Sequence, residues 1–568
     1  MELQDLLAKG YFPVQLPTGF STKQLAANLS HIQAPWDAEL AKKNSVLSLG
    51  ERFSVARSSY SRRITSIINP VNFYGLARDI CEYWPRIQEH YETSEISRSI
   101  PGSGGSLRAI DLTKFTDLYE ERVRQSAGAR YALVTDISSY FPTVYTHTIP
   151  WALHTKAVAK TNKKKTAQHF GNILDGRCMG TQDGQTVGLP IGPDTSHIIA
   201  EIIGVSIDKA IHEELGAWPK GFRYVDDFTF FFNRREEAER ALAVIIKCVS
   251  SFELQINASK TRIVEVRELV QESWKYSLKK LQISAMIRQQ KDDIHYYFEM
   301  LFSLESRFKD ESLVKYGLKQ LSSTIIKIPN WPIAEAYLLK CGYGFPNTLQ
   351  VITQILATYH HHGYPLNLIA ITDFCSNLLE SASAANHHSE TAWLLWLSKE
   401  IGITLKASLI EQVLRVESSV CSLIALDLYH SGYVDNLIDV SSLQALVSPE
   451  ALYGTHWLMA YEGGRRRWLG NTDLSFIQGH PCFGVLLAAG VGFYSQEAKI
   501  PPIFVLKATA HGEARFNTDE EIDDNFEFDN MDEEYFDSTS RDEEDGVEHE
   551  IEEAGEDDDP LEDPDDLY

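Results

Sequence analysis

The feature that most constrains this chain is the tetrapeptide Tyr224-Val225-Asp226-Asp227, which lies between two short apolar and aromatic stretches. β-Forming residues on both sides predict two strands joined by a tight turn. Adjacent carboxylates repel each other, so both stay charged beside an apolar hairpin only if a nearby charge offsets them. A bound divalent cation is the simplest source of that charge. The tetrapeptide therefore predicts a β-hairpin whose turn faces a metal ion.

Other segments supply the rest of a sheet. Residues 131–136 form a short apolar and β-branched run that ends in an aspartate. After the hairpin, residues 234–252 carry apolar side chains at helical spacing, and strand-like runs follow at 254–257 and 260–264. The order strand, helix, hairpin, helix, strand predicts a split βαββαβ sheet.

In such a sheet the end of the first strand lies beside the hairpin turn, so we expect Asp136, Asp226 and Asp227 to share one site. Three carboxylates at one point suit two-metal phosphoryl transfer, in which one ion activates a primer 3′-hydroxyl and the other holds the triphosphate. Mg²⁺ takes oxygen ligands and bridges to substrate phosphates, and Mn²⁺ is an alternative. We expect these three aspartates to be the catalytic, metal-binding residues.

A Tyr-x-Asp-Asp hairpin preceded by a strand that ends in aspartate resembles the reverse transcriptase family. The resemblance implies an RNA-directed DNA polymerase, a nucleotidyltransferase, with Asp136 and Asp226 as principal metal ligands and Asp227 in a supporting role. Phe141 matches the aromatic residue that closes on the nucleotide sugar, which implies the use of dNTPs. The alternative for Phe141 is a core residue at a strand–helix junction.

The glycine- and proline-rich loop at 187–197 corresponds to the family's loop that packs on the template base and the incoming nucleotide. We expect Pro190, Gly192 and Lys260 to contact the nucleotide. Many reverse transcriptases have Gln where this chain has Ile191. That departure leaves untemplated synthesis open beside RNA-directed copying.

Within the family, the motifs at 136–142, 145–147 and 188–196 look like those of prokaryotic abortive-infection reverse transcriptases, an unknown group linked to anti-phage defence. The similarity covers about residues 10–280. It implies DNA synthesis that starts from nucleic acid or from a protein hydroxyl, binding of RNA or single-stranded DNA, and a homo-oligomer. Two alternatives remain: a template-copying retroelement polymerase of the group II intron or retron type, and a helical scaffold without turnover.

We expect an α+β chain of the fingers–palm polymerase class. The N-terminal segment and fingers span 1–130 and the palm spans 131–284. An α-helical, repeat-like domain at 285–516 follows from apolar and aromatic residues that recur every three to four positions. Residues 517–568 form an acidic, low-complexity tail that we expect to be disordered.

The net charge of −26 comes entirely from this tail, which holds 27 of the 79 acidic residues and one of the 53 basic residues. The rest of the chain is therefore neutral, so its basic clusters can contact a phosphate backbone. The tail is either a solubilising segment or a nucleic-acid mimic that occupies basic grooves.

Basic residues provide further candidates. Those for triphosphate or template phosphate are Arg62, Arg63 and Arg108, and those for nucleic acid are Lys163, Lys164, Lys165, Arg465, Arg466 and Arg467, with Trp468 as a stacking platform.

The cysteine pattern and the hydropathy of the chain bear on where in the cell the protein is expected. The seven cysteines are scattered without a Cys-x-x-Cys pair, which favours reduced thiols in a cytosol. No apolar run approaches about 20 residues, so we expect no transmembrane helix. The N-terminus lacks a basic region followed by a hydrophobic core, so we expect no secretory signal. A cytoplasmic, prokaryotic protein is the expectation.

Overall fold

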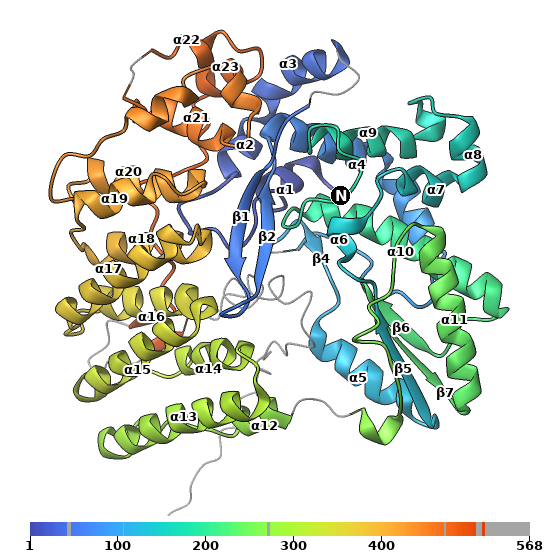
Figure 1. Ribbon diagram of the computed structural model, residues 1–568, viewed down its shortest axis with the longest axis horizontal. Helices are drawn as coiled ribbons and strands as arrows, with labels where there is room; N and C mark the ends of the chain where they lie inside the picture. Colours follow the sequence, from blue (N-terminus) through green and yellow to red (C-terminus); the bar gives the residue numbers. More distant parts are fainter. Residues whose placement is uncertain (43–46, 106, 270–272, 471–472, 507–513, 517–568) are drawn as a thin grey trace, which may run out of the picture.

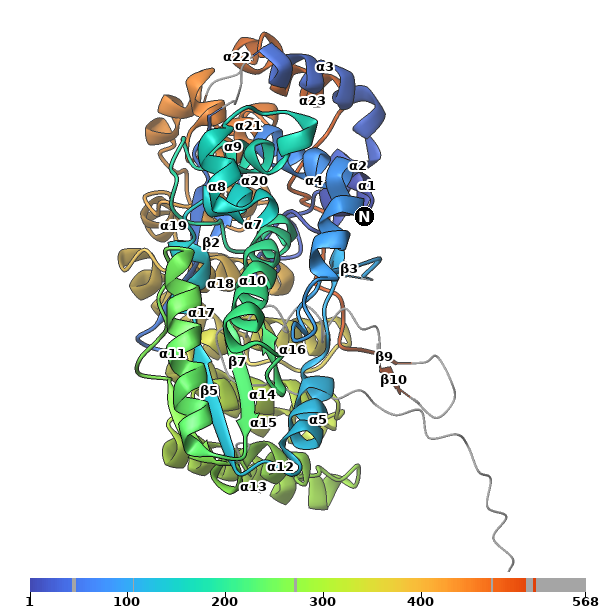
Figure 2. The same cartoon turned by 90° about the vertical axis from the view of Figure 1, so that its right-hand side faces the viewer.

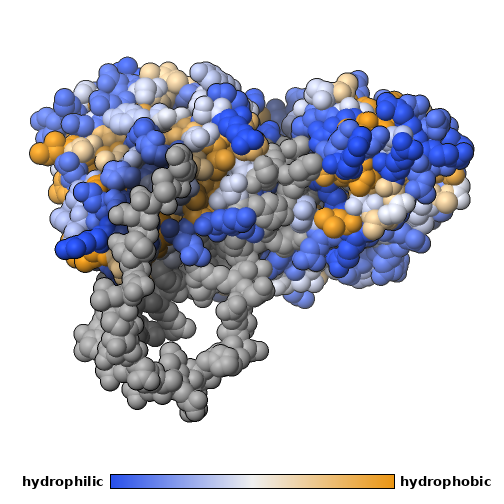
Figure 3. Space-filling model, turned by 90° about the horizontal axis from the view of Figure 1, so that it is seen from below, coloured by the Kyte–Doolittle hydropathy of each residue, from blue (hydrophilic) through white to orange (hydrophobic). Residues whose placement is uncertain are grey.

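Two lobes that meet at one end make up the molecule (Figure 1). The sheet lobe contains the strands β5–β8 with the helices α4–α11, and the helical lobe contains α12–α23. Seen from below, the sheet lobe is mostly hydrophilic, whereas more apolar residues show on the helical lobe (Figure 3). This computed structural model describes residues 1–42, 47–105, 107–269, 273–470, 473–506 and 514–516.

The N-terminal segment, residues 1–67, contains three helices and a β-hairpin: α1 (Leu3–Ala8), α2 (Lys23–Ala27), α3 (Leu29–Lys42), β1 (Glu51–Ala56) and β2 (Arg62–Ile67). The two strands pair antiparallel, with Glu51 opposite Ile67. Helix α4 (Pro70–Tyr91) follows at once, because the Asn69 side chain accepts the N–H of Val71 and Pro70 has no N–H to satisfy. Further along come the short strands β3 (Gly102–Ser103) and β4 (Ile110–Asp111) and the helix α5 (Phe115–Ser126).

The sheet contains the strands β5 (Tyr131–Asp136), β6 (Gly221–Tyr224), β7 (Asp227–Phe232) and β8 (Arg262–Glu265). They pair antiparallel in the order β6-β7-β5-β8, which is the strand order of the split βαββαβ sheet that the sequence predicts. The segment 254–257, which the sequence predicts to be a strand, is not one of the strands of the sheet. It makes only an isolated bridge, at Ile256, because the Asn257 side chain accepts the N–H of Ser259 and turns the chain.

The helices that lie between these strands in the sequence are α6 (Tyr140–Thr143), α7 (Thr148–His154), α8 (Lys156–Thr161), α9 (Gly171–Gly180), α10 (Asp194–Leu215) and α11 (Arg235–Ser251). Helix α11 packs on β5, β7 and β8, while α5 packs on β6 and β7. Helix α10 lies against α4, α7 and α11, so it connects the sheet to the N-terminal half of this lobe (Figure 2).

The helical lobe begins with α12 (Ser273–Lys279), and its helices stack in a column (Figure 1). They are α13 (Ile287–Phe308), α14 (Ser312–Ser322), α15 (Trp331–Gly344), α16 (Leu349–His361), α17 (Leu368–Ala384), α18 (His388–Ile401), α19 (Ala407–Val413) and α20 (Ser419–His430), then α21 (Trp457–Arg465), α22 (Ser475–Gln478) and α23 (Phe483–Ala488). A short hairpin of β9 (Phe504–Leu506) and β10 (Ala514–Phe516) follows.

Packing in the column is that of a solenoid of helical pairs. Consecutive helices pack as the pairs α13–α14, α15–α16, α17–α18 and α19–α20. Each helix also packs on the equivalent helix of the next pair, which makes one row of α14, α16, α18 and α20 and another of α13, α15, α17 and α19. Such an array buries apolar surface only between neighbours, so its two ends need other partners.

The N-terminal segment closes one end of this array. Strand β1 packs on α18, and α3 packs on α23. Three buried tryptophans donate their indole N–H across this joint: Trp36 to the carbonyl of Cys482, Trp393 to that of Gln15 and Trp457 to that of Ile67, at 3.0 to 3.2 Å. The two lobes are therefore joined through the N-terminal segment as well as through the chain that leads into α12.

The longest described helices, α4, α10 and α13, have 22 residues each and carry charged side chains along their length. Within the described parts of the chain, no helix has the long apolar stretch that crossing a bilayer requires.

Candidate active site

The strand register brings the three predicted aspartates to one edge of the sheet. Asp136, the last residue of β5, pairs directly with Asp227, the first residue of β7. Asp226 lies in the two-residue turn between β6 and β7, and its carbonyl accepts the N–H of Ile137 at 3.1 Å. Side chains on directly paired residues of an antiparallel sheet are close neighbours. The turn and the end of β5 therefore form one acidic edge.

The three carboxylates differ in exposure. Asp136 is 5% exposed and Asp226 is 7% exposed, whereas Asp227 is open to solvent. A buried carboxylate keeps its charge only next to a compensating cation or hydrogen-bond donors. The two buried aspartates are thus the ones with most to gain from a bound cation.

Lys260 supplies positive charge at this edge. Its ammonium lies 3.0 Å from Oδ2 of Asp136. Burial by itself would lower the pKa of Lys260, but the hydrogen bond and charge of Asp136, together with the charges of Asp227 and Asp226, raise it. All three aspartates therefore act electrostatically on one ammonium group, which lies where a cation is favoured.

Oδ1 of Asp136 is buried and has no hydrogen-bond partner. An unsatisfied, buried carboxylate oxygen beside a second buried carboxylate is a ligand set that suits Mg²⁺. Among the described residues, no three metal-ligating side chains already lie close enough to form a complete metal site. Mg²⁺ fits such an open site because it takes one or two carboxylates and completes its shell with water and substrate phosphates.

Phe141 lies half-buried beside this edge. Its ring meets the rings of His197 and Tyr140 edge-on, with centroids 5.1 Å and 5.8 Å away. Burial, and then the charges of Arg108 and Arg63, lower the pKa of His197 to about 3. The aromatic wall formed by Phe141 and a neutral His197 is thus uncharged at physiological pH.

The loop of Pro190 and Gly192 is held against the same wall. The carbonyl of Phe141 accepts the N–H of Leu189 at 2.7 Å, and the carbonyl of Pro190 accepts the Ser196 hydroxyl. Gly192 has a φ of +119°, and a Cβ there would lie 2.8 Å from a ring carbon of Pro13, so only glycine fits. The structure therefore places Phe141, Pro190 and Gly192 together, on two adjoining backbone segments.

Arg108 does not fit its interpretation as a phosphate contact. Its side chain is 4% exposed and forms a buried ion pair with Asp194. It also donates to the carbonyls of Phe12 and Gly192, at 2.9 and 2.8 Å. Arg108 is thus an internal support of the loop.

Arg62 and Arg63 lie on opposite faces of β2. The Arg62 guanidinium makes a two-pronged ion pair with Glu390 of α18, at 2.6 and 2.7 Å, and is engaged inside the protein. Arg63 is close enough to His197 for its charge to lower the pKa of that ring. Of the two candidates, Arg63 is the one on the side of Phe141.

The other basic candidates lie away from this edge. Lys163, Lys164 and Lys165 are exposed in the segment after α8, on the sheet lobe. Arg465 and Arg466 bind Glu462, whereas Arg467 is exposed; all three lie at the end of α21 (Trp457–Arg465), which is on the opposite side of the molecule from α8 (Figure 1).

Trp468 is not an open stacking platform. It is 7% exposed, its ring stacks on His430 with centroids 5.1 Å apart, and the Arg466 guanidinium lies 5.0 Å from its ring centroid. The indole faces are thus occupied by the protein itself.

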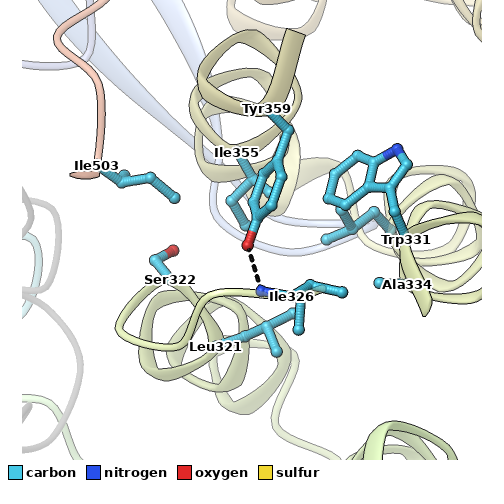
Figure 4. Close-up of a pocket in the computed structure, with 9 residues that line it drawn as sticks. Leu321, Ser322, Ile326, Trp331, Ala334, Ile355, Tyr359 and Ile503 are labelled. Atoms are coloured by element: carbon cyan, nitrogen blue, oxygen red, sulfur yellow. Dashed lines mark hydrogen bonds between the residues drawn. The ribbon is translucent and has the colours of Figure 1, made fainter. Parts of the chain in front are cut away.

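The helical lobe contains a small apolar cavity between α14, α15 and α16 (Figure 4). Leu321, Trp331 and Ile355 are among its lining residues, and the Tyr359 hydroxyl there accepts the N–H of Ile326 at 2.8 Å. Its lining offers no cluster of charged groups for a nucleotide.

One residue of the site has no obvious signal in the linear sequence. Arg223, two residues before Val225, is fully buried, and its partners lie on α10, on the segment 96–99 and in the turn itself. The available signal is the spacing of Glu201, Gly204 and Asp208, which places all three on one face of a helix.

The chain matches a known protein family over part of its length. Residues 59–296 match the family model described as reverse transcriptase (RNA-dependent DNA polymerase). The matched stretch runs from the tip of the β1–β2 hairpin into α13, and includes the three aspartates, Phe141 and the loop. No curated protein matches the chain.

Among solved structures, a similar chain is that of apo telomerase from Candida tropicalis, with 11% sequence identity, a TM-score of 0.27 and coverage of 72% of each chain. A TM-score at that level does not establish a shared fold. The family match does establish a reverse transcriptase domain: the protein is an enzyme, a nucleotidyltransferase of the RNA-dependent DNA polymerase kind. Such a domain implies binding of dNTPs and nucleic acid.

Proposed function

We propose that Asp136, Asp226 and Asp227 form the catalytic centre of this polymerase and hold its divalent metal ions. The observation that carries the proposal is the direct pairing of Asp136 with Asp227 beside the buried turn carboxylate Asp226. Asp136 and Asp226 would be the principal ligands, and the more exposed Asp227 would support them. Bound Mg²⁺ would supply a Lewis acid for the primer hydroxyl and for the charge on the triphosphate.

In the proposed reaction, the primer 3′-oxygen bonds to the α-phosphorus of a dNTP, its proton leaves, and pyrophosphate departs. The chain's own residues position the reactants. Lys260 can exchange its contact with Asp136 for a phosphate oxygen, since its ammonium already lies at the acidic edge. Arg63, which is 9% exposed and whose charge acts on the His197 ring beside Phe141, would contact the triphosphate as well.

Phe141 would set the preference for deoxynucleotides. It lies half-buried against His197, on a backbone tied to the Pro190–Gly192 loop. A rigid aromatic edge beside the nucleotide sugar leaves no room for a 2′-hydroxyl. We therefore propose that Pro190 and Gly192 hold this wall in place and contact the base pair or the nucleotide.

The finer proposal is DNA synthesis in anti-phage defence, either RNA-directed or untemplated, with priming from nucleic acid or from a protein hydroxyl. It is supported by the resemblance to abortive-infection reverse transcriptases and by Ile191 in place of a common glutamine. The solenoid of helical pairs after the palm is a further support, because it is an appendage of the kind that this group carries. RNA or single-stranded DNA, a homo-oligomeric state and a prokaryotic cytoplasm belong to the same proposal.

A template-copying retroelement polymerase is the second candidate. The intact set of Asp136, Asp226 and Asp227 serves it equally well. The two candidates differ in whether the product depends on an added template.

The test is incorporation of labelled dNTPs by the purified full-length protein with Mg²⁺, with and without its co-purified RNA. The Asp226→Asn, Asp227→Asn double variant should lose incorporation by at least about a thousandfold, because it removes charge that the metal and transition state need. Asp292→Asn, on the exposed surface of α13, is the matched control and should retain activity. A double variant that still polymerises would refute the assignment.

The same assay separates the finer proposals. Product that stays attached to protein after RNase treatment supports protein-primed synthesis. Product whose sequence follows an added RNA template, and which disappears without it, supports the retroelement candidate.

A further inference from the structure

The turn that carries Asp226 has an unusual backbone. Val225 has a φ of +52°, in the left-handed region that β-branched residues rarely adopt. Such a conformation persists only where the surroundings hold it in place. The direction of the Asp226 carboxylate depends on this backbone, because Asp226 is the next residue.

Both polar groups of Val225 are held by buried side chains. Its N–H donates to the Ser99 hydroxyl oxygen at 2.8 Å, and its carbonyl accepts from Nη1 of Arg223 at 2.8 Å. Ser99 links Val225 to Glu201, because the Ser99 hydroxyl accepts from Val225 and donates to Glu201 at 2.8 Å. The turn is therefore linked to charged residues of the protein interior.

Arg223 is saturated by these contacts. Its side chain is 0% exposed, and its five N–H groups meet the four carboxylate oxygens of Glu201 and Asp208 and the carbonyl of Val225. A guanidinium with all donors engaged in fixed directions is a rigid support. The Arg223 side chain also approaches the Ser99 hydroxyl, at 3.4 Å, and of these partners Val225 belongs to the acidic edge.

Helix α10 is shaped to receive this guanidinium. Glu201 and Asp208 lie seven residues apart on the helix, and Gly204 lies between them on the same face. A Cβ at Gly204 would come within 2.7 Å of the guanidinium carbon of Arg223, so a larger residue would displace it. Helix α10 also begins at the loop that contacts Phe141, which connects the nucleotide wall to the turn.

Ser99 is positioned by the edge of the sheet. The segment 96–99 runs beside β6: the N–H of Arg223 donates to the carbonyl of Ile96, and the N–H of Arg98 donates to the carbonyl of Arg223, both at 2.8 Å. This pairing brings the Ser99 hydroxyl beside Val225.

We propose that Ser99, Arg223 and the Glu201–Gly204–Asp208 face of α10 form a positioning device that holds Val225 left-handed and so aims the Asp226 carboxylate at the metal site. None of these residues touches substrate; they act through the backbone of the turn. The inference rests on the proposed role of Asp226 as a metal ligand.

The test compares Ser99→Ala, Val225→Gly and the double variant in the full-length protein. Ser99→Ala removes the acceptor of the Val225 N–H, so hydrogen exchange of that amide should speed up at least about tenfold. Mn²⁺ binding in the absence of nucleotide, followed by electron paramagnetic resonance, should weaken, and kcat should fall about tenfold while the KM for dNTP stays within about twofold. Glycine adopts positive φ freely, so Val225→Gly should restore Mn²⁺ affinity and kcat in the Ser99→Ala background.

Ser206→Ala is the matched control. The Ser206 hydroxyl lies on α10 between Gly204 and Asp208 in the sequence and donates to the carbonyl of Ala152 at 3.2 Å, so this variant removes a hydroxyl from the same helix but no contact with Arg223 or the turn. It should leave Val225 exchange and Mn²⁺ binding unchanged. Gly204→Ala tests the same turn from the helix side and should behave like Ser99→Ala, with the same rescue.

Two outcomes overturn the inference: Ser99→Ala with faster Val225 exchange but unchanged kcat and Mn²⁺ affinity, or loss that Val225→Gly does not relieve. A wild-type protein that neither binds Mn²⁺ nor incorporates dNTPs would instead refute the proposed metal site. Hydrogen exchange at Val225 needs no metal, so the two failures can be told apart.

Discussion

The sheet lobe and the helical lobe differ in how far along the chain their stabilising contacts reach. The strands of the sheet all lie within 131–265 and pair with one another. The end of the helical array is held instead by the N-terminal segment, through tryptophan hydrogen bonds that span 378 to 446 residues of sequence. The helical array, which follows the palm in the sequence, is therefore not held by the palm alone: it also packs on the hairpin that carries Arg63.

The largest expected effect on folding comes from removing the packing of the N-terminal segment on the helical lobe. Deleting residues 1–42 removes Trp36 and with it the buried packing of α3 on α23, so we expect the protein to fail to fold. Cutting the covalent link instead, with a protease site placed after Leu269, should leave the two pieces associated. Size-exclusion chromatography of the cut protein checks this. Pieces that separate without denaturant would show that the covalent link, and not the N-terminal segment, joins the lobes.

A smaller effect is expected from the ion pair between β2 and α18. Arg62→Ala leaves Glu390, whose side chain is 5% exposed, without its guanidinium, which should destabilise the protein by about 3–5 kcal/mol. Adding Glu390→Gln removes the stranded charge and should recover part of that loss. Urea unfolding measures both.

Arg52→Ala, on the exposed side of the paired strand, is the control and should change stability little. Equal losses in Arg62→Ala and Arg52→Ala would mean that the hairpin is not anchored through Glu390.

The third effect depends on pH. Glu51, the first residue of β1, is fully buried and accepts the N–H of Ser419 at the start of α20 at 2.6 Å. Burial raises its pKa from 4.5 to about 7, so the folded protein holds this proton more tightly than the unfolded chain does. The protonated Glu51 therefore contributes to the free energy of unfolding. This contribution is fully present below about pH 4.5 and is lost as the pH rises through about 7, which lowers the free energy of unfolding by about 3 kcal/mol.

Glu51→Gln should remove this dependence, so its stability relative to wild type should improve by about 3 kcal/mol between pH 4.5 and pH 8. Urea unfolding at both pH values is the measurement, with the exposed Glu89→Gln as control. A Gln variant that tracks wild type at both pH values would show that Glu51 is not the titrating group at the joint.

Much of the sheet lobe was predictable because its signals are local. The Asp-Asp turn, the alternating apolar strands and the helical spacing at 234–252 each stand in one short stretch of sequence, and their order leaves few sheet topologies. The reverse transcriptase domain is confirmed by the family match over 59–296. The catalytic roles of the three aspartates, of Phe141 and of Lys260 stay predictions.

The surface candidates were harder to predict because charge alone does not say which way a side chain points. The sequence predicts Arg108 as a phosphate contact, but Arg108 is buried in an ion pair with Asp194. Arg62 forms an ion pair with Glu390, which is 328 residues away in the sequence. Trp468 follows three arginines, yet its ring is covered by His430. The acidic tail lies outside the residues that the structure describes, so the two hypotheses for it, a solubilising segment and a nucleic-acid mimic, stay predictions.

By itself, the sequence determined the hairpin with its paired carboxylates, the preceding strand that ends in Asp136, and the helical character of the second half. These follow from backbone propensity and side-chain periodicity, which act over a few residues. Two features became visible in the tertiary structure and not in the sequence: α10 holds Arg223 behind the turn, and the N-terminal segment packs on the helical array. Those contacts join residues far apart in the chain, and burial, which decides their strength, is a property of the whole fold.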